Sequence, residues 1–153
     1  MELKELLTPF IETAQECFDA MVNAPLKLKD MAFAEARRRQ NGLVAMIPMT
    51  GDLQGLIALS LGTEEALKTV SRFVGEPVTE MDEGACDAAG EIINIIAGGK
   101  SKIRGRQVQM GLPSVIVGQP MLLALPRDLP IVDIRFEAAE IGAVNLLICL
   151  KMG

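Results

Sequence analysis

Three polar side chains of types that can take part in chemistry, Asp87, Glu91 and Asn94, are separated by four and three residues. In an α-helix these spacings bring neighbouring Cβ atoms to about 5–6 Å of one another on a single face. A carboxylate in such a row can pair with a cationic group, and an amide can hold a reactant in position. This polar stripe is therefore a candidate site whose chemistry would depend on positioning and electrostatics.

The composition narrows the chemistry open to such a site. The chain of 153 residues contains no histidine, tryptophan or tyrosine, which excludes Ser-His-Asp and Cys-His catalysis and histidine-containing zinc sites. The same absence removes base-stacking platforms, and the net charge of −5 repels phosphate backbones, so no nucleic-acid partner is expected. An enzyme of this composition must use carboxylates, amides, hydroxyls, lysine or arginine, or groups supplied by a partner.

The segment that carries the polar stripe has the pattern of an amphipathic helix, expected from about residue 80 to 104. Thr79 and Asp82 approximate a capping box at its start, and basic residues at 100–104 suit the negative end of the helix dipole. At 3.6 residues per turn, the apolar residues fall on one face, which is expected to pack in the core. These residues are Ala85, Ala88, Ala89, Ile92, Ile93, Ile95, Ile96 and Ile103.

The polar stripe has two interpretations. Polar residues normally form only the solvated side of an amphipathic helix. Gly84 and Gly98, however, flank the stripe on the same face, although glycine costs a helix about 1 kcal/mol relative to alanine. No lysine or arginine falls on this face before Lys102. Because missing side chains let another surface approach closely, Gly84, Asp87 and Gly98 are predicted to contact a partner.

The rest of the chain predicts further helices and strands. Apolar spacings of three and four predict a helix over 2–23, restarted or loosened at Pro9, and Thr63 is expected to cap a second helix that ends near Gly75. Gly51-Asp52 predicts a hairpin with a two-residue connection. Strand-like segments lie at 43–50, 53–61, 114–118, 121–125, 131–137 and 143–151. Short connections between them predict an α+β fold in which one domain, 1–153, places a layer of helices on a mainly antiparallel sheet.

Other features bear on location. The longest uncharged stretch, 107–126, is broken by prolines, so no membrane-spanning helix is expected. The N-terminus lacks the pattern of a signal peptide. Cys17, Cys86 and Cys149 are far apart and are expected to be buried free thiols in a reducing compartment, which predicts a cytoplasmic protein. The basic run 37–39 is expected on a solvated strand or loop.

The residues of the polar stripe resemble a known motif. The run Asp87-Ala-Ala-Gly-Glu91-Ile-Ile-Asn94 is similar to the motif of the CheC, CheX and FliY phosphatases of bacterial chemotaxis: aspartate or serine, three residues, glutamate, two residues, asparagine. The similarity continues in Ala97-Gly98, in 112–118, and upstream in 50–55 and 65–70, and covers about residue 42 to the end. CheC and FliY usually carry the motif twice. This chain has it once, which points to the CheX type.

The resemblance implies a CheC/CheX-like fold and hydrolysis of the aspartyl phosphate on a CheY-like response regulator. In these phosphatases the partner's receiver domain supplies the phospho-aspartate, Mg²⁺ and a lysine, so the chain is expected to hold no metal or cofactor of its own. Asn94 would then position the attacking water and Glu91 would pair with the receiver's lysine, while Asp87 matches the less strict first position. A homodimer through sheet edges is also implied, with the apolar segments 115–117 and 145–150 as candidates.

Two alternatives stay open. A non-catalytic module could dock on a receiver through the same glycine-flanked stripe, although docking alone would not require the amide of Asn94. A structural subunit of the flagellar switch would instead associate stably with motor proteins. The sequence does not identify the regulator or the behaviour that it controls.

Overall fold

One antiparallel sheet and three helices make up the fold. The computed structural model describes all residues, 1–153. The sheet has the order β1-β6-β7-β3-β2-β4, and β5 also pairs with β2. The strands are β1 (Lys27–Phe33), β2 (Arg37–Gly51), β3 (Leu53–Leu61), β4 (Val108–Met110), β5 (Ser114–Ala124), β6 (Val132–Ala138) and β7 (Gly142–Met152). The predicted α+β fold with a mainly antiparallel sheet is confirmed.

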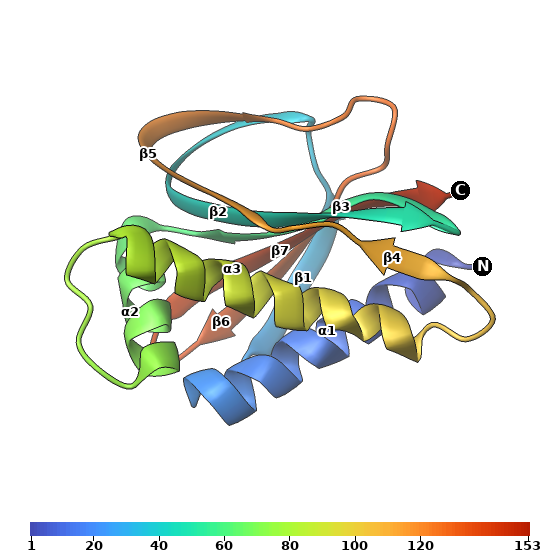
Figure 1. Cartoon of the computed structure of the whole chain (residues 1–153). Helices are drawn as coiled ribbons and strands as arrows, with labels where there is room; N and C mark the ends of the chain where they lie inside the picture. The colour runs from blue at the N-terminus through green and yellow to red at the C-terminus, as the bar shows by residue number, and fades with distance from the viewer.

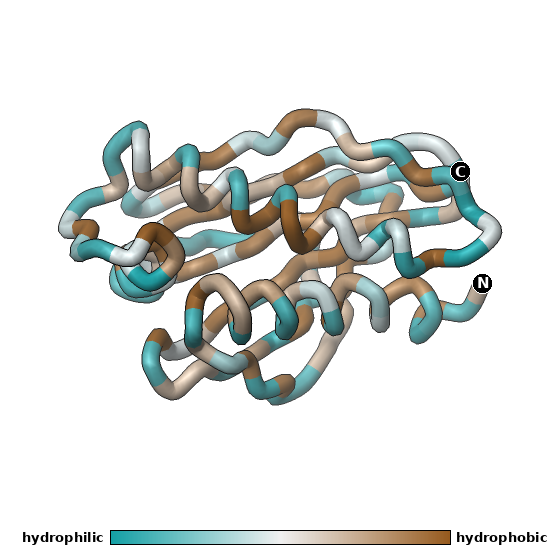
Figure 2. Tube along the Cα trace, turned by 60° about the horizontal axis from the view of Figure 1, so that its bottom comes forward, coloured by the Kyte–Doolittle hydropathy of each residue, from teal (hydrophilic) through white to brown (hydrophobic).

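The helices lie on one face of the sheet (Figure 1). They are α1 (Leu3–Cys17), α2 (Thr63–Val74) and α3 (Glu83–Ala97), with a π-helical turn η1 (Phe18–Val22) after α1 and a 3₁₀ turn η2 (Gly98–Lys102) after α3. The largest hydrophobic cluster, of 37 buried residues, joins the helices to the sheet, and Figure 2 shows hydrophobic segments along the strands and helices that meet there. None of the helices combines the length and apolar composition needed to cross a membrane.

Pro9 neither restarts nor loosens the first helix, so both sequence-based expectations for it are wrong. The α-helix is continuous from Leu3 to Cys17 and buries Pro9. Its first turn is closed, because the backbone N–H of Glu2 donates to Glu5 Oε2 at 3.3 Å. The proline costs one backbone hydrogen bond, and burial of an apolar stripe that includes the fully buried Phe10 offsets this loss.

The predicted helix caps are shifted. Asp82, not Thr79, caps α3, since Asp82 Oδ1 accepts a hydrogen bond from the Ala85 N–H at 2.9 Å. Gly62, not Thr63, is the N-cap residue of α2. The α-helical part of the third helix is Glu83–Ala97 rather than 80–104, and it continues as the 3₁₀ turn η2. The helix dipole and hydrophobic pattern indicate roughly where a helix lies, but they do not fix its terminal residue.

Four strands differ from the sequence-based prediction, and one of them, β2, begins at Arg37 rather than at residue 43. β1 and β4 were not expected: every residue of β1 is exposed, so the strand shows no alternating pattern, and β4 has only three residues. The segments 114–118 and 121–125 form one strand, β5, despite Pro120. This proline is tolerated because β5 is an edge strand that pairs only with β2, through a register shift between Gln40 and Gly42.

The apolar segment 145–150 does not lie at a sheet edge, so its suggested role in edge pairing is wrong. It belongs to β7, which is hydrogen-bonded to β6 on one side and to β3 on the other. Its strong apolar character reflects burial on both faces of a central strand. Unpaired sides remain on β1 at one end of the sheet and on β4 and β5 at the other.

The face of the sheet opposite the helices carries a second, smaller core. The beginning of β2 and the end of β5 curve over this face (Figure 1). Seven buried residues lie in the second core: Val44, Ala58, Leu123, Leu125, Ile131, Leu147 and Cys149. The single layer of helices is therefore correct, but the fold also covers part of the other face with its own strands.

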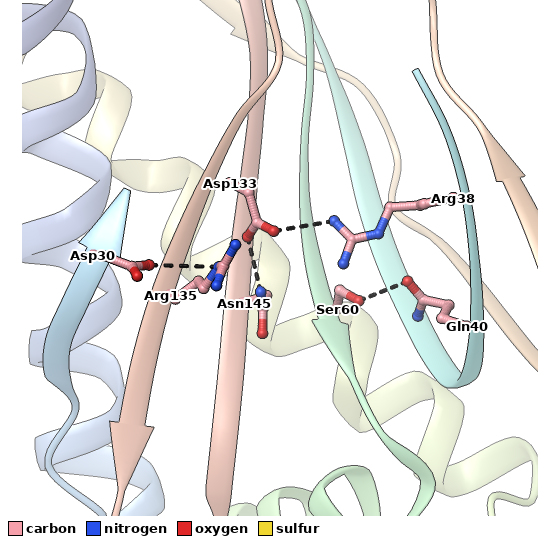
Figure 3. A network of polar contacts seen from close by, with 7 residues as sticks. All are labelled: Asp30, Arg38, Gln40, Ser60, Asp133, Arg135 and Asn145. Atoms are coloured by element: carbon pink, nitrogen blue, oxygen red, sulfur yellow. Dashed lines mark hydrogen bonds and ion pairs between the residues drawn. The ribbon is translucent and has the colours of Figure 1, made fainter. Parts of the chain in front are cut away.

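A polar network lies between the curved part of β2 and the sheet (Figure 3). Arg38 Nη1 lies 3.3 Å from Asp133 Oδ2, and Asn145 Nδ2 donates to Asp133 Oδ1 at 2.8 Å. Ser60 donates to Gln40 Oε1 at 2.9 Å. The expectation that the basic run 37–39 is solvated therefore fails for Arg38, whose guanidinium pairs with a carboxylate of which only 10% of the side-chain surface is exposed.

Replacement of Asp133 by alanine is expected to lower the free energy of unfolding by about 2 kcal/mol, because Asn145 loses a buried partner and Arg38 loses its counter-ion. Chemical denaturation monitored by circular dichroism measures this change. The matched control is Asp30→Ala, which removes the exposed ion pair with Arg135 and should cost less than about 1 kcal/mol. Equal losses in the two variants would show that burial of the network is unimportant.

Candidate functional site

α3 presents the polar stripe on its outer side. The Asp82 cap orients the first turn, and the opposite face of the helix is anchored in the main core. The predicted core residues of this helix are buried, apart from the half-buried Ile95. Asp87 and Glu91 are exposed and Asn94 is half-buried. The structure thus confirms the predicted helical alignment and places all three side chains at the surface.

The side chains of the polar stripe have no partner within the chain. The polar contacts of this region instead lie at the two ends of the helix. At the start, the Ala85 N–H donates to Asp82 Oδ1. Beyond the end, the Ser101 hydroxyl donates to Gly98 O at 3.0 Å, and Lys102 Nζ lies 2.8 Å from Glu16 Oε1. The carboxylates and the amide of the stripe are therefore free to engage another molecule without first breaking an internal contact.

A groove of about 490 Å³ runs beside the polar stripe. One wall is α3 and the other is the start of β5, and the lining residues are Cys86, Asp87, Gly90, Glu91, Asn94, Pro113 and Val115. The three residues of the stripe are thus brought together with an apolar wall from a distant part of the chain. Gly84 and Gly98 do not line the groove.

Gly90, Pro113 and Val115 were not predicted as site residues. Gly90 is buried, and a Cβ atom there would lie 3.6 Å from both Pro113 Cγ and Val115 Cγ2. The missing side chain therefore leaves open the space between α3 and β5. The signal in the sequence was the motif similarity at 112–118, which indicated relatedness but did not indicate that this segment faces the helix.

The glycines of the helix have different roles. A Cβ atom on Gly99 would lie 2.7 Å from Thr13 Oγ1 and 2.8 Å from the Pro9 carbonyl oxygen, so this glycine allows η2 to approach α1. Gly98 has an ordinary helical φ of −57°, and a Cβ atom added to it would meet no other atom within 4 Å. A Cβ atom on Gly84 would meet only Asp82 Oδ1, at 3.7 Å. Packing within the chain requires glycine at position 99 but not at 84 or 98.

The cysteines do not supply a nucleophile. All three are free, and Cys17 and Cys149 are buried as expected, but Cys86 is half-buried at the groove. Burial raises the pKa of the Cys86 thiol, and the negative charges of Asp82 and Asp87 raise it further. Since the thiolate is the reactive form, these effects disfavour Cys86 as a nucleophile. No cluster of three or more Cys, Asp or Glu side chains is arranged to hold a metal ion.

Comparison with known proteins identifies similarity to CheX chemotaxis phosphatases. Residues 43–137 match the family model described as "Chemotaxis phosphatase CheX". Over 85 residues the chain is 34% identical to the protein of Thermotoga maritima named "CheY-P phosphatase CheX". That match covers 53% of this chain and 55% of the relative, so the chain spans about half the length of the curated relative that it matches.

Solved structures share the fold. The crystal structure of a chemotaxis protein CheX from Desulfovibrio desulfuricans superposes with a TM-score of 0.86 at 21% identity, covering 96% of this chain and 99% of the other. The structure of a CheX-CheY-BeF3-Mg+2 complex from Borrelia burgdorferi superposes with a TM-score of 0.79 at 18% identity, covering 95% and 97%. With a family model that matches more than half of its residues, the motif helix among them, this chain belongs to the CheX family.

Proposed function

We propose that this chain is a phosphatase that hydrolyses the aspartyl phosphate of a CheY-like receiver domain. The observation that carries this proposal is the pair Glu91 and Asn94, one helical turn apart and without internal partners, at the rim of a groove in a CheX-family chain. The T. maritima relative is named a CheY-P phosphatase, and the B. burgdorferi CheX was crystallised with CheY, beryllium fluoride and Mg²⁺. Both names support the same partner and substrate for this chain.

In the proposed reaction the amide of Asn94 hydrogen-bonds a water molecule and holds it in line with the phosphorus atom. The water oxygen forms a bond to phosphorus while the bond between phosphorus and the aspartyl oxygen breaks. The products are inorganic phosphate, which takes up the protons of the water, and the receiver's aspartate carboxylate. Positioning of this kind needs no histidine, in keeping with the composition.

Glu91 is proposed to pair with the receiver's lysine and thereby to set the position of Asn94 over the phosphoryl group. The receiver would supply the Mg²⁺, and the chain would contribute no metal or cofactor. The proposed lack of a metal site on this chain is supported by the polar stripe itself. The stripe offers only the two carboxylates of Asp87 and Glu91 as hard-ion ligands, fewer than Mg²⁺ or Ca²⁺ usually takes. Stoichiometric binding of Mg²⁺ to the isolated chain in calorimetry would contradict this assignment.

Asp87, Gly84 and Gly98 are proposed to lie in the contact with the receiver. Gly84 and Gly98 lack a packing reason within the chain, and both flank the polar stripe, where added side chains would hold a partner away. Asp87 is exposed and lines the groove. A partner that approaches α3 closely enough for Asn94 to reach its active site would cover all three positions.

The test of this function is phosphate release from phosphorylated receiver domains of the same organism, timed with and without the chain. The proposal expects the chain to accelerate release from at least one receiver. A receiver that binds the chain tightly but keeps its phosphoryl group at the uncatalysed rate would instead support the non-catalytic binding module.

A cytoplasmic location is part of the proposal. The proposed substrate is a signalling protein that receives its phosphoryl group inside the cell. The three cysteines are free, which suits a reducing compartment.

We also propose a homodimer, formed through the unpaired side of β1 rather than that of β5. β1 exposes Leu28, Met31 and Phe33 by 43%, 49% and 72%, and unpaired strand edges with apolar side chains favour pairing between chains. α3 packs against β2 and β5, at the end of the sheet opposite β1. A dimer through β1 would therefore leave both grooves open, whereas pairing through β5 would crowd them.

Light scattering at high micromolar concentration is expected to give the mass of a dimer for the wild-type chain. Phe33→Glu should shift the mass toward that of a monomer, because it places charge in the proposed interface. The matched control is Val117→Glu, a change at the exposed edge of β5, which should leave the mass unchanged. A monomeric wild-type chain would refute the dimer, and dissociation by Val117→Glu alone would move the interface to β5.

A further inference from the structure

We infer that Leu112 is an apolar anchor that holds the receiver domain against the groove and determines which receivers bind well. The inference rests on the proposed function and extends it with a residue for partner affinity. Glu91 and Asn94 lie on one side of the groove, and Leu112 lies next to Pro113 on the other.

Leu112 is an exposed hydrophobic residue next to the groove, because Pro113, the residue that follows it, lines the groove. Of its surface 86% is accessible, more than for any other large hydrophobic residue of the chain. Full burial of a leucine side chain favours the buried state by about tenfold or more, so the free chain forgoes nearly all of this stabilisation. Contact with a partner at this position would recover it.

The backbone on either side of Leu112 is firmly held. The N–H of Gly111 donates to the Pro48 carbonyl oxygen of β2 at 2.9 Å. A Cβ atom on Gly111 would lie 2.6 Å from Pro48 Cγ, so only glycine allows this close approach. Pro113 follows directly, and proline restricts both its own φ and the conformation of the residue before it. Leu112 is thus presented to solvent on a stiff segment that loses little conformational freedom on binding.

The position of Leu112 ties it to the candidate site. The connection from β4 to β5 passes beside α3 (Figure 1). Pro113, the next residue, shares the groove with Glu91 and Asn94. A receiver domain whose phosphoryl group reaches Asn94 therefore also lies beside Leu112, and no separate docking event is needed.

The two walls of the groove specify a partner surface of mixed character. The α3 wall carries the carboxylates of Asp87 and Glu91, which favour a cationic group. The β5 wall, with Pro113 and Val115, is apolar and leads to Leu112. The matching surface on the receiver has a positive charge at its active site and an apolar patch next to it. The charge would be common to receivers that carry an active-site lysine, so the apolar patch would distinguish among them.

The test compares Leu112→Ser with the wild-type chain in two assays on the same receiver. Dissociation constants are measured with the receiver loaded with beryllium fluoride and Mg²⁺, and kcat and KM are measured with the phosphorylated receiver. The variant is expected to raise Kd and KM about tenfold or more, the share of affinity that one buried leucine contributes. It should leave kcat within about twofold, because Leu112 does not touch the reacting atoms.

The matched control is Leu122→Ser, a change to the exposed leucine of β5, whose surface is 55% accessible. It lies in the part of β5 that pairs with the beginning of β2, where Leu122 is opposite Arg39, and it should leave Kd and KM unchanged. Circular dichroism melting confirms that both variants are folded. Equal weakening by the two variants would mean that any exposed leucine contributes, and would overturn the anchor.

The outcomes separate the anchor from the proposed function. If the wild-type chain releases phosphate and Leu112→Ser has unchanged Kd and KM, the anchor is refuted and the phosphatase stands. If kcat falls at constant Kd and KM, the anchor is also refuted. If the wild-type chain binds the receiver without releasing phosphate, and Leu112→Ser weakens that binding about tenfold, the phosphatase fails and the anchor stands.

Discussion

Replacement of Asn94 by alanine is expected to reduce turnover of the phosphorylated receiver by at least about 10²-fold, the scale of a lost positioning contact. The affinity for a receiver loaded with beryllium fluoride should change little. Asn94 is half-buried and has no hydrogen-bond partner for its side chain within the chain, so the substitution removes the water-holding amide and leaves the fold intact. Phosphate release at saturating receiver concentration and binding by calorimetry measure the two quantities.

The matched control for Asn94→Ala is Gln109→Ala, which removes an exposed amide from β4. This control should keep wild-type turnover. A folded Asn94→Ala variant that works at the wild-type rate would refute the catalytic assignment and favour the binding module in its place.

Replacement of Glu91 by alanine is expected to reduce both affinity and turnover, with kcat/KM lower by about 10–100-fold, the range of one charge-assisted hydrogen bond. Glu91 is exposed and has no counter-ion within the chain, so its removal should leave the stability nearly unchanged. The loss of affinity distinguishes this variant from Asn94→Ala, because Glu91 would act in docking as well as in alignment. Titration of the beryllium-fluoride-loaded receiver measures it.

Glu64→Ala is the matched control for Glu91→Ala. Glu64 is an exposed glutamate in the first turn of α2 and does not line the groove, so it contributes similar charge without the proposed contact. If both variants lose the same affinity, the effect is one of overall charge, and a specific pair between Glu91 and the receiver's lysine is excluded.

The helix of the polar stripe was predictable because its pattern is local. Spacings of three and four residues decide which side chains share a face, so the buried face and the alignment of Asp87, Glu91 and Asn94 followed from the sequence and agree with the structure. A hairpin near Gly51-Asp52 was predictable for the same reason, since Gly51 has a φ of +97° that favours glycine. The expected two-residue connection is wrong, however, because the last pair of the hairpin is Met49 with Gly55. Both features depend on residues only a few positions apart.

The places of β1 and β7 in the sheet depend on neighbouring strands, which the local sequence pattern does not identify. Every residue of β1 is exposed, and the strand forms only because β6 offers a free edge. β7 has the apolar character of a strand that could pair with another copy, yet it lies inside the sheet. Burial on two faces and exposure at an edge can produce similar sequences, so strand order cannot be derived from hydrophobicity alone.

The two walls of the candidate site also differ in how far the sequence predicts them: the polar wall depends on local spacing, and the apolar wall depends on tertiary packing. Asp87, Glu91 and Asn94 are aligned by one helix, and the motif alone was enough to find them. The groove forms only where Pro113 and Val115 pack beside Gly90, a contact between segments more than twenty residues apart. Pairing of β5 with β2 and packing of α3 on the same strands bring these segments together. Local periodicity carries no information on such a contact, because the free energy that forms it comes from burial across the whole sheet.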